Sequence, residues 1–141
     1  LLVKDREDPG HFKWIWSKTL RTHKPQSPVF EGQLVVLTDG GTYSTATDVV
    51  SALHNNREAI FVGQETGGGY YGNTSALHVT ALLPNSGLKI DIPMIRYTNP
   101  VDKPEWIGRG IIPDVPVVNT YQDVVAGRDA MLETALEQFK K

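Results

Sequence analysis

Short apolar runs separated by turns organise the first half of the chain. Residues 34–37 form an apolar run within 32–38, and residues 59–63 form a second one. Runs of this length, bounded by turn residues, are typical of buried strands. Between them, residues 45–55 place Val49, Ala52 and Leu53 on one face of a predicted helix. The order strand, helix, strand predicts a parallel βαβ unit.

The second half of the chain changes its pattern. Residues 76–83 and 88–97 are joined by the turn residues 84–87, and their alternation predicts a β-hairpin. Residues 121–126 predict a helical turn. Residues 129–140 have the spacing of an amphipathic helix, with Leu132, Ala135, Leu136 and Phe139 expected to point inward.

The first 31 residues are mixed in character. Residues 11–16 alternate like a strand after a turn signal at 8–10. We therefore divide the chain into an irregular lead-in, 1–31, and a domain, 32–141. The predicted fold class is α/β, with a parallel βαβ unit, a hairpin and a C-terminal helix.

Composition and charge narrow the function classes. The 141 residues carry a net charge of -2, which gives no electrostatic reason to expect nucleic acid or an anionic membrane as partner. No run approaches the roughly 18 apolar residues that a membrane span needs. Cysteine is absent, which excludes disulfides, thiolate metal sites and a cysteine nucleophile. The four histidines lack metal-ligand spacing, so no metal and no cofactor are expected.

Ser44 lies where a serine can be chemically useful. It follows a buried strand and the glycine turn 39–42, and it precedes the predicted helix. The first N–H groups of a helix are unpaired and its dipole is positive there, so backbone donors beside Ser44 could stabilise an oxyanion. The alternative is that Thr42, Ser44 or Thr45 only caps the helix. Thr45 and Asp48 have the spacing of a capping box.

Four segments, in order, resemble one enzyme family. The first is 34–39 with Thr-Tyr-Ser-Thr-Ala-Thr-Asp at 42–48, and the second is Val-Gly-Gln-Glu-Thr-Gly-Gly-Gly at 62–69. The third is Gly-Arg-Gly-Ile-Ile-Pro-Asp at 108–114, and the fourth is 121–136 with its Ala-Gly-Arg-Asp. Together they resemble the C-terminal-processing and tricorn-type serine peptidases, also called tail-specific proteases. The resemblance implies that 32–141 is the C-terminal half of a catalytic core with a Clp-protease/crotonase-like fold.

The resemblance also implies roles for single residues. Ser44 takes the place of the nucleophile that forms an acyl-enzyme, and the N–H of Thr45 is one half of the oxyanion hole. Gly68, Gly69 and Tyr70 would flank the substrate cleft.

The general base is the part of this family's machinery that the chain does not match. C-terminal-processing members use a lysine at the position of Gly69, so a Ser–Lys dyad is not available. A tricorn-type histidine is expected before Leu1. The assisting glutamate would fall at Ile107, which makes Glu105, two residues away, the candidate and Asp102 a weaker one.

The expected substrate is a peptide or protein, and the expected location is outside the cytoplasm, in the periplasm or cell envelope. Two rival functions stay open. The chain can be a peptide-binding remnant without catalysis. It can also be an acyl-thioester enzyme of the same fold, in which Ser44 is only a helix cap.

Overall fold

The computed structural model describes residues 2–14, 24–56, 59–75, 77–102 and 106–140. The chain divides into two compact units, Leu1–Gly32 and Gln33–Lys141. In the first unit, β1 (Leu2–Lys4) and β2 (Phe12–Trp14) pair antiparallel. The strand expected at 11–16 is therefore found over three residues, and residues 15 and 16 lie outside the described part.

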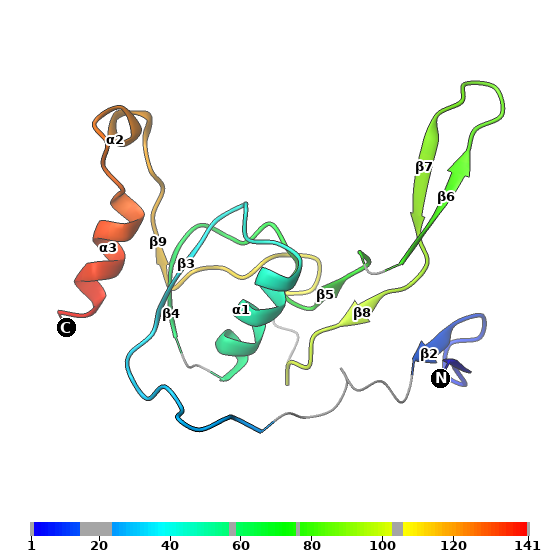
Figure 1. Cartoon of the computed structure of the whole chain (residues 1–141), viewed down its shortest axis with the longest axis horizontal. Coiled ribbons are helices and arrows are strands. Elements are labelled where there is room, and N and C mark those ends of the chain that lie inside the picture. Colours follow the sequence, from blue (N-terminus) through cyan, green and yellow to red (C-terminus); the bar gives the residue numbers. More distant parts are fainter. Residues whose placement is uncertain (1, 15–23, 57–58, 76, 103–105, 141) are drawn as a thin grey trace. The chain divides into compact units, whose positions relative to one another are not determined.

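A parallel sheet forms the centre of the second unit (Figure 1). Its strands are β3 (Val35–Thr38), β4 (Ile60–Gly63) and β9 (Val115–Pro116), in the order β3-β4-β9. The two apolar runs are the two longer strands, paired so that Thr38 lies opposite Gly63. The carboxyl ends of β3 and β4 therefore meet at one edge. The two-residue strand β9 was not predicted, because it is too short to show a periodicity.

The helix α1 (Thr45–Asn56) connects β3 to β4 and packs through a partly polar face. Val50 belongs to the core cluster with Phe61, Tyr70 and Ile111. The predicted face is partly wrong, because Val49 is 56% exposed although Leu53 does pack against the core. The buried face includes Thr47 and Ser51, whose hydroxyl groups are satisfied inside the protein.

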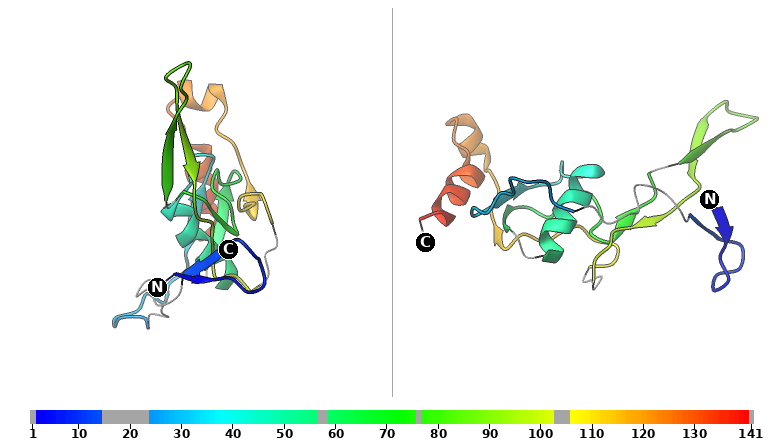
Figure 2. Two further views of the ribbon diagram at one scale, coloured as in Figure 1. Left: turned by 90° about the vertical axis from the view of Figure 1, so that its right-hand side faces the viewer. Right: turned by 60° about the horizontal axis from the view of Figure 1, so that its bottom comes forward.

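Two antiparallel pairs lie between β4 and β9 in the sequence (Figure 2). The predicted hairpin is β6 (His78–Leu82) with β7 (Lys89–Pro93). Before and after it, β5 (Gly72–Asn73) pairs with β8 (Tyr97–Thr98). This second pair brings the two ends of the hairpin segment back together, and it was not predicted.

The C-terminal segment contains two helices, α2 (Tyr121–Val125) and α3 (Ala130–Gln138). Thr120 and Asp123 form a capping box for α2, and the Asp129 side chain caps α3. In α3 the buried residues are Met131, Ala135 and Gln138. The expected inward face was wrong except for Ala135, because Leu132, Leu136 and Phe139 are exposed, whereas the buried face of α3 lies against β3 and β4.

The predicted α/β class is confirmed, with its parallel βαβ unit, hairpin and C-terminal helix. Within the described ranges, no helix is long and apolar enough to cross a membrane.

Candidate functional site

Ser44 has a backbone conformation that side chains rarely adopt. Its φ is 57°, and it is the one non-glycine residue with positive φ in the described part of the chain. For a residue with a Cβ this left-handed conformation costs roughly 1–2 kcal/mol. Such residues persist where the surroundings impose them, and they gather at active sites and ligand clamps. Ser44 is also exposed, so its hydroxyl can meet a substrate.

The turn before Ser44 is held by its own side chains. Asp39 Oδ1 accepts from the Gly41 N–H at 2.8 Å, and the Thr42 N–H donates to the Asp39 carbonyl at 2.9 Å. In return, the Asp39 N–H donates to Thr42 Oγ1 at 3.1 Å. These reciprocal bonds at the end of β3 set the path along which the chain enters Ser44.

The first turn of α1 presents backbone donors next to Ser44. Thr45 is the first helical residue, and the Ser44 carbonyl accepts from the Asp48 N–H at 3.1 Å. The Thr45 N–H is therefore one of the N–H groups that the helix itself leaves unpaired, at the positive end of its dipole. The capping box expected between Thr45 and Asp48 does not form, because Thr45 lies inside the helix and the Asp48 carboxylate binds Tyr97 instead.

The glycine-rich loop 66–69 packs directly on this turn. The Gly68 N–H donates to the Thr42 carbonyl at 3.0 Å. A Cβ at Gly67 would overlap the Gly40 carbonyl, and one at Gly68 would overlap Thr47 Oγ1. The loop needs glycine at these positions because its backbone touches the segment that carries Ser44.

Gly69 also has no room for a side chain. A Cβ there would lie 2.8 Å from the Gly72 carbonyl oxygen, closer than real Cβ contacts come. A lysine at this position, as in the C-terminal-processing group, would require the backbone to shift.

Tyr70 belongs to the core. Its side chain is 2% exposed, and its ring packs against His54 and Trp106 with centroids 5.5 Å and 5.3 Å away. The Tyr70 carbonyl accepts from Ser51 Oγ at 3.0 Å and from Asn99 Nδ2 at 2.9 Å. Its ring therefore belongs to the core and also lines the pocket at the far end of α1, and its expected place beside the substrate cleft stays a prediction.

Hydrogen bonds join the segment 108–114 to the segment 62–70, so these two motifs depend on each other in the fold. Thr66 and Ile111 exchange two bonds, from the Thr66 N–H to the Ile111 carbonyl at 3.1 Å and from the Ile111 N–H to Thr66 Oγ1 at 2.8 Å. Glu65 accepts twice from Arg109, at 3.2 Å and 2.6 Å, and this pairing lowers the pKa of the Glu65 carboxyl. These contacts hold the glycine loop in place beside the Ser44 turn.

Asp114 has a structural partner. Its Oδ2 accepts from the Phe61 N–H at 2.8 Å, so the last residue of the Gly-Arg-Gly-Ile-Ile-Pro-Asp segment fixes the start of β4. This contact joins the third motif to the strand that precedes the glycine-rich loop.

A chain of polar side chains reaches α1 from the ribbon β5–β8. Asn73 Nδ2 donates to the Tyr97 hydroxyl at 2.7 Å, and that hydroxyl donates to Asp48 Oδ2 at 2.8 Å. Burial raises the pKa of Tyr97, and the hydrogen bond to Asp48 raises it further. Sequence reasoning missed Asn73 and Tyr97, because no pattern links residues so far apart; Asp48, four residues after Ser44, was the one available signal.

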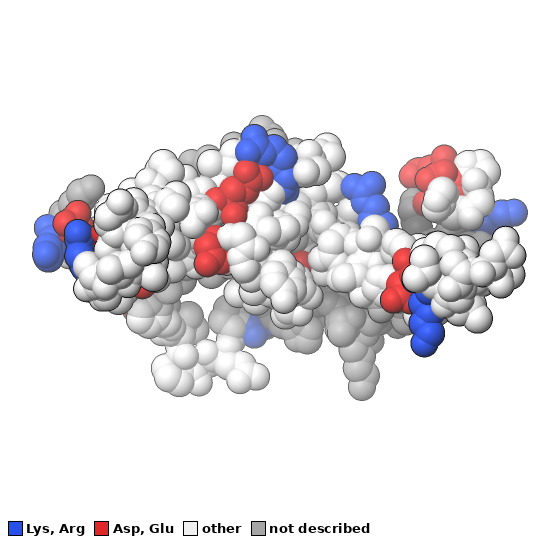
Figure 3. All heavy atoms as spheres, turned by 90° about the horizontal axis from the view of Figure 1, so that it is seen from above, with Lys and Arg blue, Asp and Glu red and all other residues white. Residues whose placement is uncertain are grey.

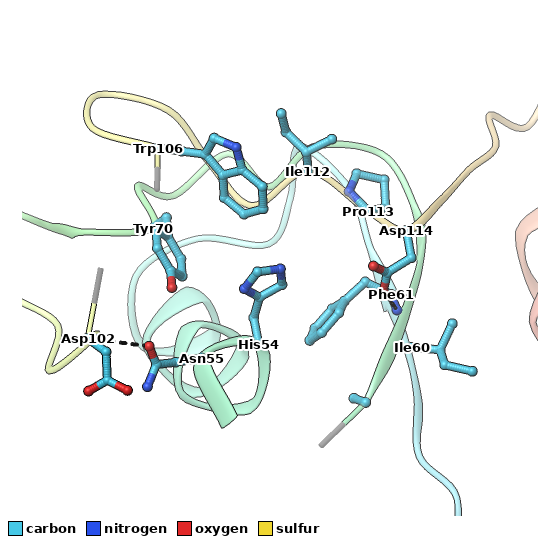
Figure 4. A pocket seen from close by; sticks show the side chains of 11 residues that line it. His54, Asn55, Ile60, Phe61, Tyr70, Asp102, Trp106, Ile112, Pro113 and Asp114 are labelled. Atoms are coloured by element: carbon cyan, nitrogen blue, oxygen red, sulfur yellow. Dashed lines mark hydrogen bonds between the residues drawn. The ribbon is translucent and has the colours of Figure 1, made fainter. Parts of the chain in front are cut away.

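A pocket lies at the other end of α1, away from Ser44 (Figure 4). The His54 ring points between aromatic side chains there, with centroids 4.9 Å from Trp106 and 5.4 Å from Phe61. The Asp102 N–H donates to Asn55 Oδ1 at 2.9 Å. At 1.5 Å per residue, this end is roughly 15 Å from the start of the helix. Neither His54 nor Asp102 therefore lies beside Ser44.

Glu105 and the histidines other than His54 differ in what the structure describes of them. Glu105 lies outside the described residues, as does His23. His78 is on the exposed hairpin strand β6, and His11 pairs with Asp8 in the first unit. The described histidines of the second unit, His54 and His78, thus lie at the pocket end of α1 and on β6.

In the described part of the chain, neither the distribution of charge nor the metal-ligating side chains indicate a further site. On the face drawn in Figure 3, acidic and basic residues occur in small separate groups, without an extended basic surface. Among the residues that the structure describes, no three histidine, aspartate or glutamate side chains converge on a metal position.

One family model matches most of the chain. The model of peptidase family S41 matches residues 5–117, well over half of the chain. No curated protein matches the chain. A solved structure of a candidate peptidase from Parabacteroides merdae is 26% identical over 77% of this chain, with a TM-score of 0.49. The chain spans only 32% of that structure's length.

Proposed function

The chain belongs to peptidase family S41, and on that premise we propose that it acts as a serine peptidase with Ser44 as the nucleophile. Ser44 Oγ attacks the carbonyl carbon of the scissile peptide bond and gives its proton to a general base. The base then protonates the leaving amine, and an acyl-enzyme remains on Ser44. Water hydrolyses this ester, and the serine regains its proton.

The observation that carries the proposal is the conformation of Ser44. Ser44 is a strained, exposed serine at a strand-to-helix turn, and it directly precedes Thr45, whose N–H the helix itself leaves unpaired. A donor in that place suits the negative charge that develops on the carbonyl oxygen, and the positive helix end adds to it. A serine that only capped the helix would have no need of a positive φ, because cap residues ordinarily lie in the extended region.

For the base we propose a tricorn-type histidine rather than a lysine. The crowding at Gly69 supports this choice, since a side chain there would collide with the Gly72 carbonyl. Glu105 remains the proposed carboxylate that orients the histidine. Removing the side chain of Glu105 should then alter the pH profile of hydrolysis more than the binding of peptide.

The proposed substrate is an extended peptide or a protein C-terminus, bound along the backbone of Gly68 and Gly69. The contact between this loop and the Ser44 turn supports that placement. Cleavage of the C-terminal-processing kind and a location outside the cytoplasm stay predictions that rest on the resemblance.

Labelling with a fluorophosphonate probe tests the nucleophile. The full-length protein should be labelled on Ser44, and Ser44→Ala should lose both labelling and peptide hydrolysis. Ser86→Ala is the matched control, because Ser86 is an exposed serine on the hairpin turn.

Labelling together with assays of peptide binding and thioester hydrolysis separates the two rival functions, the peptide-binding remnant and the acyl-thioester enzyme. Peptide binding without labelling of the wild type would favour the non-catalytic reading. Hydrolysis of an acyl thioester that survives in Ser44→Ala would favour the thioester enzyme and would refute the role of Ser44.

A further inference from the structure

We propose that Asp48, Tyr97 and Asn73 form a positioning chain that keeps Ser44 in its reactive conformation. The inference rests on the proposed function, because it concerns the geometry of the nucleophile. It assigns these three side chains a role in the reaction through Ser44, and none of them needs to touch the substrate.

The link between Asp48 and Ser44 is a backbone bond. The Asp48 N–H donates to the Ser44 carbonyl at 3.1 Å, which is the first hydrogen bond of α1. A shift of the Asp48 turn therefore pulls on the carbonyl of Ser44 and on its strained backbone. A residue at φ 57° keeps that conformation only while its neighbours impose it.

The Asp48 side chain ties this turn to a paired ribbon. Tyr97 donates to Asp48 Oδ2, and Asn73 donates to the Tyr97 hydroxyl. Asn73 and Tyr97 lie opposite each other on β5 and β8, which run side by side (Figure 1). The Tyr97 hydroxyl is thus held by Asn73 of its own ribbon. It would therefore not move together with α1 if the helix were displaced.

A second attachment lies nearly one turn further along α1. Asn99 Nδ2 donates to Ser51 Oγ at 3.2 Å, and Asn99 follows directly after β8. Two contacts at neighbouring turns, from one segment, oppose rotation of α1 about its own axis. Such a rotation would change the directions of the Ser44 hydroxyl and the Thr45 N–H. The two groups would then no longer meet the same peptide carbonyl group.

The chemistry of the Asp48 carboxylate makes the Tyr97 bond important. A hydrogen bond to a charged carboxylate is about twice as strong as one between neutral groups. Asp48 Oδ1 is buried and has no hydrogen-bond partner among the described residues. Removal of the Tyr97 hydroxyl would therefore leave both carboxylate oxygens without a donor from the described part, and the turn would move to find one.

Tyr97→Phe in the full-length protein tests this inference, with Tyr71→Phe as its matched control. Tyr71 comes just before β5 and its ring lies under Arg96 Cζ, 5.9 Å from the centroid. Both variants remove one hydroxyl from the same region. We expect Tyr97→Phe to lower kcat and the rate of fluorophosphonate labelling by about tenfold, with KM changed by less than about twofold. Tyr71→Phe should stay within about twofold of the wild type in each quantity.

Variants of Asp48 provide the second measurement. Asp48→Ala should lose as much as Tyr97→Phe, and the double variant should lose no more than either one, since both act through one bond. Asp48→Asn keeps an oxygen that can accept from Tyr97, so it should recover most of the labelling rate. All rates are measured at one temperature, about 10 °C below the lowest melting temperature among the variants, so that unfolding does not enter.

Three results would overturn the positioning chain. The first is an equal effect of Tyr97→Phe and Tyr71→Phe. The second is a lower melting temperature of Tyr97→Phe with unchanged labelling, which would make the contact merely structural. The third is additive loss in the double variant. If instead Ser44→Ala keeps its labelling, the proposed function itself has failed, and the positioning chain is rejected with it.

Discussion

Replacing Gly68 with alanine should displace the turn that carries Ser44. An added Cβ would overlap Thr47 Oγ1 and would lie 2.8 Å from Thr47 Cβ and 3.0 Å from Tyr43 Cα. The first neighbour can only move by breaking its bond to the Thr42 carbonyl, at 2.9 Å. The last neighbour is backbone and is adjacent to Ser44. The substitution therefore presses on the nucleophile turn from the side of the glycine loop.

The size of the effect follows from these contacts. Forcing extra volume into a packed site costs about 1–3 kcal/mol. Thr47 is 1% exposed, so a hydroxyl that loses its partner there stays unsatisfied, which adds about 1 kcal/mol or more. We expect the free energy of unfolding to fall by about 3 kcal/mol. The labelling rate of Ser44 should fall by at least about tenfold, because small displacements of a reacting group are costly.

Gly40→Ala is the matched control in the same turn. A Cβ at Gly40 meets no atom within 4 Å, so this variant should differ from the wild type by less than about 1 kcal/mol. Urea unfolding followed by circular dichroism, together with the rate of fluorophosphonate labelling, measures both effects. If Gly68→Ala matched Gly40→Ala in stability and labelling, the contact between the loop and the turn would not exist in solution.

Ser44→Gly should be more stable than Ser44→Ala by about 1 kcal/mol, because only glycine adopts a positive φ without strain; equal urea midpoints would show that Ser44 is relaxed. Glu65→Gln should be less stable than the wild type at neutral pH, and the difference should shrink as the pH falls below the ordinary glutamate pKa. The sign of this stability difference follows because pairing with Arg109 lowers the folded-state pKa of Glu65. The stabilisation is therefore present above the unfolded-state pKa and is lost on acidification. A stability difference that is unchanged in acid would contradict this. Asp114→Ala should cost about 1–2 kcal/mol by leaving the Phe61 N–H without its acceptor, and Asp114→Asn about half of that, because its amide oxygen still accepts. Thermal unfolding of the pair checks the ratio, and equal losses would mean that the charge of Asp114, and not its acceptor, matters.

Local pattern was sufficient for the main elements of the second unit. The apolar runs at 34–37 and 59–63 became β3 and β4, and the alternating segments around residues 84–87 became the hairpin. Each of these elements is defined by neighbours within a few residues, so its periodicity is visible in one dimension. The short strands β5, β8 and β9 have two residues each and exist only through their partners.

Helix faces were harder to predict than helices. In α3 the residues Leu132, Ala135, Leu136 and Phe139 were predicted to form the inner face. Of these only Ala135 is buried, together with Met131 and Gln138. Hydrophobicity identifies candidates for burial, but the neighbouring strands decide which side is covered. Polar residues can occupy the covered side when they are bonded there, as Thr47 and Ser51 are in α1.

The sequence by itself indicated the family, which is confirmed over residues 5–117, and it identified Ser44 as the residue most worth testing. Each motif is a run of a few neighbouring residues, so it can be recognised without knowing the fold. The tertiary structure alone decided that Ser44 has a positive φ, that Tyr70 is core, and that Gly69 has no room for a side chain. It alone brought the Tyr97 hydroxyl to Asp48, across 49 positions of the chain. Contacts over such separations depend on where the sheet, helix and ribbon are placed, and no short-range pattern of residues records that.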